Sequence, residues 1–132
     1  MSVEATSKTL RSYLDALVAR GDFADYFTDD VSWTMVGSGQ HLEGRGPVHD
    51  FLTWMHTQAF DAHPQVTTLV VGDGHAALEA EFVGSHTSEF LGIPATGRSV
   101  QVPYCVVYDL REDKITALRA YIPMDLFTQQ LK

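Results

Sequence analysis

The sequence predicts an α+β fold in which helices come first and an antiparallel sheet follows. Up to about residue 60, apolar side chains recur at the three- and four-residue spacing of helices, around one short strand. After His63-Pro64 the chain changes to alternating runs rich in β-branched residues. The Gly72-Asp73-Gly74 run between two of them is a strong hairpin signal. We therefore expect a single domain over residues 1–132, with helices packed on the concave face of a cone-shaped, curved antiparallel or mixed sheet.

Helices and one strand are expected in the first half. Leu10, Leu14 and Leu17 follow helical spacing, and Gly21 suits the position just past a helix end. Pro47 suits the first turn of a second long helix, because an N–H at that position has no helical partner in any case. The expected elements are a helix that ends before Gly21, a short helix over 23–27, a strand over 31–36 and a helix over 48–60.

Four strands and a short last helix are expected in the second half. Turn residues separate the strands, first at the glycine hairpin, then in a loop through Gly97 and then in the charged turn 111–114. Pro123 precedes the last apolar segment and favours a helix after it. The strands are expected over 66–71, 76–87, 99–110 and 115–122, and the helix over 124–131.

Charge and cysteine content limit the partners and the compartment. The formal net charge is −8 and the isoelectric point is about 5.0, whereas nucleic-acid binding needs a basic surface. No apolar run reaches the length that spans a bilayer, and MSVEATSKTL lacks the basic start and apolar stretch of a signal peptide. Cys105 is the one cysteine, so no internal disulfide can form. We expect a cytoplasmic protein without nucleic-acid or membrane partners.

Strand parity predicts the wall of the pocket that a bent sheet under helices encloses. A bulge at Pro103 would shift this assignment on its strand. The expected wall consists of Trp54 from the helix over 48–60 and, from the strands, Trp33, Met35, Phe82, Val106, Tyr108, Leu118, Ala120 and Ile122, with Gly84, His86, Tyr104 and Tyr13 also pointing inward. This apolar set predicts a small apolar organic ligand.

The opposite face of the sheet is expected to be partly covered by a second copy of the chain. Its residues would be Glu79, Glu81, Val83, Cys105, Val107, Asp109, Arg119 and Tyr121. This set is too apolar for a wholly solvated face, which favours a homodimer through the outer sheet face.

The predicted catalytic residues are His86, Tyr104 and Tyr13. By parity His86 is the one inward side chain whose ordinary pKa suits proton transfer near neutral pH, so it is the expected general acid/base. The alternative is a strand-end histidine that hydrogen-bonds the following loop. Tyr104 and Tyr13 could orient a carbonyl or stabilise a developing oxyanion, or they could simply bury their rings.

The other histidines are expected to be surface residues. His49 and His56 lie two helical turns apart, about 10 Å along the axis, which is too far to share one ion. With His63 they resemble a metal cluster only in composition. His41 and Glu43 are a weak second acid/base pair or polar loop residues. We expect neither a metal nor a cofactor.

The loop that follows the second strand of the hairpin is the most characteristic segment. The run GSHTSEFLGIPATGRSV, followed by a strand and then DKITALRAY, resembles the SnoaL-like polyketide cyclases. It also resembles the limonene epoxide hydrolases and ketosteroid isomerases of the same nuclear transport factor 2-like superfamily. FTDDVSW followed by GRGPVHDFL resembles their first strand and the helix after it. The resemblance implies a cone-shaped domain with a deep apolar pocket, a homodimer and cofactor-free acid/base chemistry.

The chain departs from these enzymes at their acid/base positions. The inward aspartate of the cyclases falls on Val106, or on Cys105 if the hairpin shifts by one residue. The base of the isomerases falls on Met35, and Tyr13 approximately matches their first-helix tyrosine. The Asp-Arg-Asp positions of the epoxide hydrolases correspond to Gly84, Phe82 and Ala120, and those of their water-holding tyrosine and asparagine to Trp33 and Met35. The resemblance therefore implies the fold and the pocket, without the usual carboxylates.

These observations lead to a cofactor-independent enzyme acting on a small apolar, polyketide- or terpenoid-like substrate. It would catalyse a cyclisation, isomerisation or dehydration, with His86 as acid/base. One alternative is a non-catalytic small-molecule binding protein on the same fold, which the missing carboxylates favour. Two further alternatives are an epoxide hydrolase-like activity, which lacks its triad here, and an interaction module.

Overall fold

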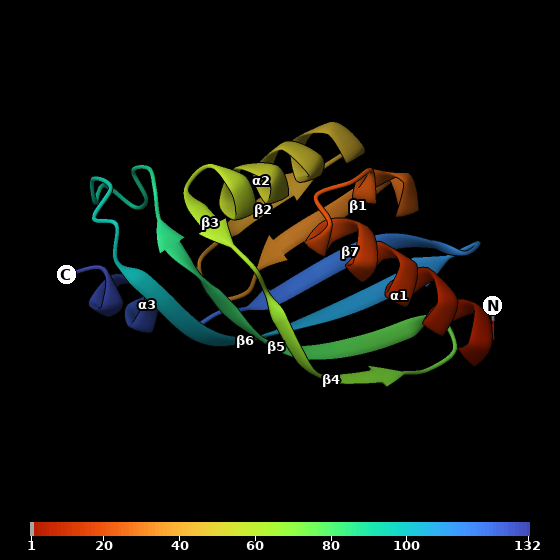
Figure 1. Cartoon of the computed structure of the whole chain (residues 1–132). Coiled ribbons are helices and arrows are strands. Elements are labelled where there is room, and N and C mark those ends of the chain that lie inside the picture. Colours follow the sequence, from red (N-terminus) through yellow and green to blue (C-terminus); the bar gives the residue numbers. More distant parts are fainter. Residues whose placement is uncertain (1) are drawn as a thin grey trace.

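The computed structural model describes residues 2–132 and shows the expected α+β architecture. Helices α1 and α2 lie over the concave side of one strongly curled sheet (Figure 1). Helix α3 lies beside β6, at the end of the molecule opposite the N-terminus (Figure 1). The elements in chain order are α1 (Val3–Val18), the 3₁₀ helix η1 (Phe23–Tyr26), β1 (Phe27–Met35), β2 (Gln40–Glu43), α2 (Arg45–Thr57), β3 (Phe60–Ala62), β4 (Gln65–Val71), β5 (His75–His86), β6 (Ser99–Arg111), β7 (Lys114–Tyr121) and α3 (Met124–Gln130). Within this described part, no helix is both long and apolar enough to cross a membrane.

The sheet is mixed, with strand order β2-β1-β7-β6-β5-β3 and with β4 also paired to β5. Only β1 and β7 run parallel in the registers observed, and every other pair is antiparallel. The long strand β5 pairs with β4 along its first part and with β3 along its last part. Strands β4 and β3 therefore pair with the same edge of β5, one after the other, from the hairpin at Gly72 to the loop over 87–98.

Strand parity holds on β5 and β6. Their register runs without a shift from the His75–Asp109 pair to the Ser85–Ser99 pair, so Pro103 introduces no bulge. The register instead shifts on β4 between Val66 and Thr68, and between β6 and β7 after Asp109. The even-numbered residues of β5 and β6 therefore face the interior, as the sequence predicts.

Two strands and several boundaries differ from the prediction. β2 and β3 were not expected, and β1 begins at Phe27 instead of residue 31. The predicted helix over 48–60 is shifted, because α2 already starts at Arg45 and the chain leaves the helix after Thr57. The amides of Gln58 and Ala59 both bond to the carbonyl of Trp54, and this tight end turns the chain into β3.

The interior consists of two apolar clusters. The larger one lies between α1 and the sheet and contains Tyr13, Phe27, Val31 and Leu118. The second lies between α2, β3 and α3 and is rich in phenylalanine, where Phe60 and Phe127 contact each other and both contact the rings of Phe82 and Phe90. A cavity opens where the two clusters meet.

Candidate active site

The cavity is enclosed by α1, α2, the start of β4 and the concave face of the sheet. The space between its walls is about 740 Å³, a figure that includes the part open to solvent. Its lining residues are Tyr13, Leu14, Leu17, Val18, Trp33, Met35, Phe51, Leu52, Met55, His56, Pro64, Val66, Leu78, Phe82, Tyr104, Val106, Tyr108, Leu118, Ile122 and Phe127. No carboxylate, lysine or arginine is among these residues of the described chain.

Most of the residues that strand parity predicted as inward-facing lie together around this cavity. Tyr13 reaches it from α1 and Tyr104 from β6, as do the predicted wall residues Trp33, Met35, Phe82, Val106, Tyr108, Leu118 and Ile122. His86, Trp54 and Ala120 do not line it. Their positions are described next, because each corrects an expectation drawn from the sequence.

His86 lies inside the second apolar cluster, away from the cavity. The residue is completely buried, and its ring centroid is 5.4 Å from that of Phe60. Its Nδ1 accepts a 3.2 Å hydrogen bond from the backbone N–H of Thr96 and lies 3.0 Å from the Thr96 hydroxyl. The ring hydrogen is therefore on Nε2, which is buried with no hydrogen-bond partner in residues 2–132. This geometry is that of the alternative, a strand-end histidine that anchors the following loop.

Trp54 and Ala120 support the wall from behind. Trp54 packs between Phe51 and Phe90, with ring centroids 6.1 and 5.9 Å away. Ala120 is fully buried between Met35 of β1 and Val106 of β6, so these larger neighbours form the surface there. Both residues affect the cavity only through their neighbours.

His56 is a wall residue that the sequence analysis missed. It stands in the last turn of α2, half-buried, with its ring edge-on to Phe82 at 5.5 Å. Its Nδ1 donates a 2.7 Å hydrogen bond to the carbonyl of Leu52, which fixes the neutral tautomer and leaves the Nε2 lone pair free to accept. The sequence pattern that could have revealed this position is the helical spacing of Val48, Leu52 and His56, which places the histidine on the buried face of α2.

The pKa of His56 is lowered from its ordinary value. Burial is the main cause, the positive charge of Arg20 adds to it, and the bond to Leu52 opposes it. Below a pH of about 6.5 the His56 imidazole is protonated in the unfolded chain but still neutral in the folded chain. We therefore expect stability to fall as the pH drops below that value and to level off once folded His56 is protonated. Urea unfolding across this range should show a shallower dependence in His56→Gln, and an NMR titration of the ring should give the low pKa directly. An unshifted resonance would contradict the burial described here.

Three phenols face the cavity as hydrogen-bond donors. Burial raises the pKa of Tyr104 to about 12. Burial also raises the pKa of Tyr13 and of Tyr108, and the nearby phenols add to both shifts. Since all three stay protonated at neutral pH, they can donate to a ligand oxygen but cannot act as general bases.

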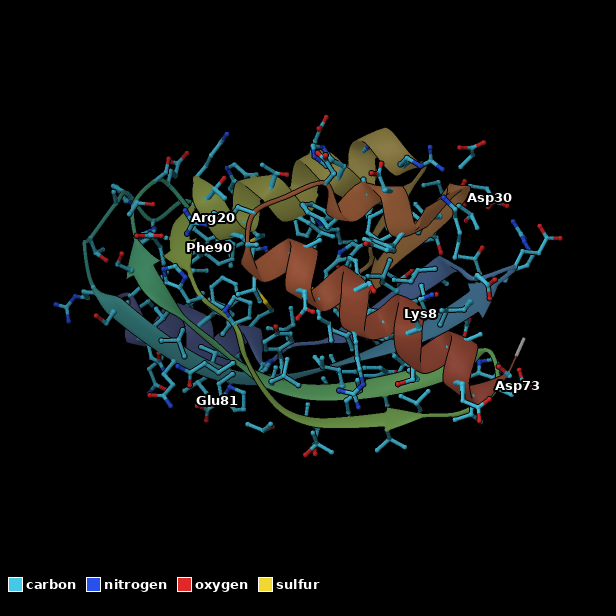
Figure 2. The ribbon with its side chains drawn as sticks, turned by 45° about the vertical axis from the view of Figure 1, so that its right-hand side comes forward. Lys8, Arg20, Asp30, Asp73, Glu81 and Phe90 are labelled. Atoms are coloured by element: carbon cyan, nitrogen blue, oxygen red, sulfur yellow. The ribbon has the colours of Figure 1, made fainter. Side chains whose placement is uncertain are left out.

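An ion pair lies beside the cavity mouth. Val18 at the end of α1 and Val66 at the start of β4 are exposed wall residues. Next to them the Arg20 guanidinium bonds to the carboxylate of Asp61 and to the carbonyl of Ala62 on β3. Figure 2 shows Arg20 just beyond the C-terminal end of α1, on the same side of the view as Phe90. The pair joins the end of α1 to β3, and the hydrogen bond from Arg20, together with its positive charge, lowers the pKa of Asp61.

The remaining polar clusters lie on the outer surface. Asp109 bonds to Arg119 through both oxygens, at 2.6 and 3.1 Å, and to His75 at 3.0 Å. His41 lies between Thr34 and Glu43, at 2.8 and 3.1 Å, and is exposed to solvent. Within residues 2–132, no three histidine, cysteine, aspartate or glutamate side chains form a group that could hold a metal ion.

The candidate site is thus an apolar cavity under helices, with one histidine and three phenols in its wall. A family model for the SnoaL-like polyketide cyclases matches residues 8–131. The chain therefore belongs to the SnoaL-like polyketide cyclase family. A comparison with curated protein sequences finds no significant match.

Solved structures share the fold at low sequence identity. A protein from Jannaschia sp. CCS1 named "putative SnoaL-like polyketide cyclase" is 19% identical, with a TM-score of 0.86 over 97% of this chain and 92% of that one. A protein with a ketosteroid isomerase-like fold from Catenulispora acidiphila, in complex with trimethylamine, is 17% identical, with a TM-score of 0.75 over 95% of this chain and 92% of that one. An "LEH-like epoxide hydrolase" of M. tuberculosis is 18% identical, with a TM-score of 0.75 over 98% of this chain and 91% of that one. At these identities the likeness extends to the fold alone.

Proposed function

We propose that the protein is a cofactor-independent cyclase or isomerase that moves a proton on a small, apolar, polyketide- or terpenoid-like ketone. The observation that carries the proposal is His56, whose Nε2 lone pair is available in the wall of an apolar cavity while its Nδ1–H is held by Leu52. The fully buried His86, which the sequence favoured for this role, has no access to the same space. His56 is therefore the general base of the proposal.

At neutral pH the lowered pKa of His56 keeps its ring in the unprotonated form that a general base needs. The side chain is neutral before the reaction, so it can accept a proton from the carbon next to a carbonyl. The phenols of Tyr104 and Tyr13 donate to the carbonyl oxygen as it gains negative charge. The apolar walls exclude water and strengthen these hydrogen bonds.

Removal of this proton gives an enolate, from which two reactions can follow. In an isomerisation, the His56 imidazolium returns its proton to another carbon of the conjugated system. In a cyclisation, the enolate carbon attacks a second carbonyl, a C–C bond forms, and the new alkoxide takes the proton from the imidazolium. In both cases His56 ends the cycle neutral and no external reactant is consumed. The fit of the substrate to the cavity would select the reactive conformer.

Exchange of carbon-bound protons with heavy water tests the proposal without the natural substrate. We expect the protein to accelerate deuterium uptake by β-tetralone, a small bicyclic ketone with acidic C–H groups next to its carbonyl. His56→Gln should lose roughly 100-fold or more of this acceleration, because general-base catalysis is commonly of that size. Mass spectrometry of the recovered ketone measures the uptake. His75→Gln is the matched control, since that histidine is exposed on the outer face.

A binding protein is the second candidate, favoured by the absence of a carboxylate from the described cavity wall. In that case β-tetralone would bind and its exchange would stay at the rate of the buffer. Equal exchange by the wild type and by His56→Gln would remove His56 from the mechanism. The homodimer through the outer sheet face and the cytoplasmic location stay predictions from the sequence.

A further inference from the structure

Helix α1 ends at a residue that is unusual for its position. The amide of Gly21 bonds to the carbonyl of Ala16, and the amide of Arg20 bonds to the carbonyl of Leu17. These two bonds are those of a Schellman motif, in which the first residue past the helix cap is left-handed and is usually glycine. Here that residue is Arg20, with a φ of 59°. The chain therefore has an arginine where glycine would be without strain.

The side chain of Arg20 joins α1 to β3. Its guanidinium bonds to the carboxylate of Asp61 and, at 3.4 Å, to the carbonyl of Ala62. The Nε2 atom of His63 lies 3.6 Å from the same carboxylate oxygen. Both partners are partly exposed, with 39% of the arginine side chain and 54% of the aspartate side chain accessible. The contact is thus a surface ion pair between segments that are 41 residues apart in the sequence.

Stability alone does not account for an arginine at this position. A residue other than glycine in the left-handed conformation shifts the folding equilibrium toward the unfolded state by about fivefold or more. An exposed ion pair shifts it in the other direction by about fivefold at most. The pair therefore does little more than offset the strain. Its place in the molecule indicates a second role.

The ion pair lies between two segments of the cavity wall. On α1, Val18 lines the cavity two residues before Arg20. After β3, Pro64 lines it three residues after Asp61. Val18 and Val66 of β4 are 47% and 44% exposed, so the cavity opens to solvent between these segments. The ion pair therefore holds the two sides of the mouth together.

Helix α1 has polar anchors in its first half and one polar contact at its end. Thr9 donates a 3.0 Å hydrogen bond to the carbonyl of Asp113, and the Thr6 hydroxyl accepts one of 3.0 Å from the amide of Gly74. Within residues 2–132, the Arg20 side chain makes the only hydrogen bonds between the C-terminal end of α1 and the sheet. Without them, this end of the helix would be held by apolar contacts alone while the first half stays anchored.

We propose that Arg20 is a latch that controls how fast ligands enter and leave the cavity, by holding the end of α1 to Asp61 of β3. When the pair breaks, the end of α1 moves away from β3 while its first half stays in place, and the mouth widens. The pair forms with and without a ligand, so it slows entry and exit alike. The inference rests on the cavity being the ligand site of the proposed function, but not on the chemistry at His56.

Hydrogen exchange of the ligand-free protein tests the latch directly. Asp61→Ala removes the carboxylate and leaves the end of α1 unchanged. We expect the amides in the last turn of α1 to exchange about fivefold faster than in the wild type, because an exposed ion pair contributes up to about that factor. Asp30→Ala is the matched control. Asp30 forms an exposed 3.0 Å pair with Arg111 and lies on the opposite side of the view from Arg20 in Figure 2, so its loss should not affect these amides.

Binding kinetics test the consequence for the cavity. Prodan is a neutral naphthyl ketone whose fluorescence changes when it leaves water, so stopped-flow mixing gives both rate constants. We expect Asp61→Ala and Arg20→Gly each to raise the association and dissociation rate constants by about fivefold, with Kd constant to within about twofold. Glycine keeps the left-handed helix end, so faster entry in that variant cannot come from an unfolded end of α1. The double variant should match the single variants, because both changes break the same contact.

The outcomes separate the latch from the cavity and from the chemistry. If prodan binds and its rate constants are the same in Asp61→Ala as in the wild type, the latch is overturned and the proposed cavity stands. Additive effects of the two substitutions would overturn it as well, because they would not act through one contact. If prodan does not bind to the wild type, the inference falls together with the proposed function. Since neither rate constant depends on proton transfer, a failed exchange test at His56 leaves the latch intact.

Discussion

Replacing His86 with alanine is expected to destabilise the protein by about 3 kcal/mol, since it removes a fully buried ring and orphans its partners. The imidazole fills space next to Phe60, and its Nδ1 is the acceptor for the backbone N–H of Thr96. The backbone of His86 also bonds to Gly97 and Arg98 on the far side of the loop. The side chain therefore helps to close the loop over 87–98 onto β5. Loss of the ring should loosen this loop as well as lower the free energy of unfolding.

Urea unfolding of His86→Ala and His75→Ala separates this structural role from a general effect of removing a histidine. His75 is exposed on the outer face, so its replacement should change the stability by less than about 0.5 kcal/mol. Hydrogen exchange should show faster opening of the amides of Thr96 and Gly97 in His86→Ala. A His86→Ala protein as stable as the wild type, with these amides still protected, would show that the loop does not depend on the ring.

Strand parity was sufficient to predict much of the cavity wall but not its limits. It placed His86 on the inner face of β5, which the structure confirms. Parity says nothing about how far along a strand the cavity extends. β5 is long, and its last residues lie under β3 and beside the phenylalanine cluster, so an inward residue there is simply buried. His86 and Ala120 share this explanation, because each points inward where packing leaves no space.

Short elements and polar wall residues carried too little local signal. β2 and β3 consist of four and three residues, and their pairing partners lie in other segments of the chain, so no periodicity reveals them. His56 was assigned to the surface together with His49 and His63, although its spacing from Leu52 matched the buried face of α2. The compensating bond from its Nδ1 to a helix carbonyl is what makes its position possible, and no pattern of residues displays that bond.

Replacing Gly84 with alanine is expected to destabilise the protein by about 3 kcal/mol or to displace β3. A Cβ at this position would lie 2.6 Å from the carbonyl oxygen of Asp61 and 2.8 Å from the Cα of Ala62. Both are backbone atoms of β3, which pairs with β5 through the Ala62–Gly84 register, so neither can rotate away. Overpacking against fixed backbone commonly costs this much. A shift of β3 would also carry Asp61 away from Arg20 and open the cavity mouth.

Gly72→Ala is the control for this substitution. Its Cβ would be 3.6 Å from the nearest carbonyl oxygen, which is ordinary contact, so its stability in urea should stay close to that of the wild type. Equal stability of the two variants would mean that β3 does not press on β5 as described.

The contact of Gly84 with β3 also bears on the epoxide hydrolase arrangement. By the sequence resemblance Gly84 stands at one of its carboxylate positions, and here the backbone of β3 occupies the space that any side chain would need. Introducing an aspartate at residue 84 should therefore unfold the β3 region before it could activate water.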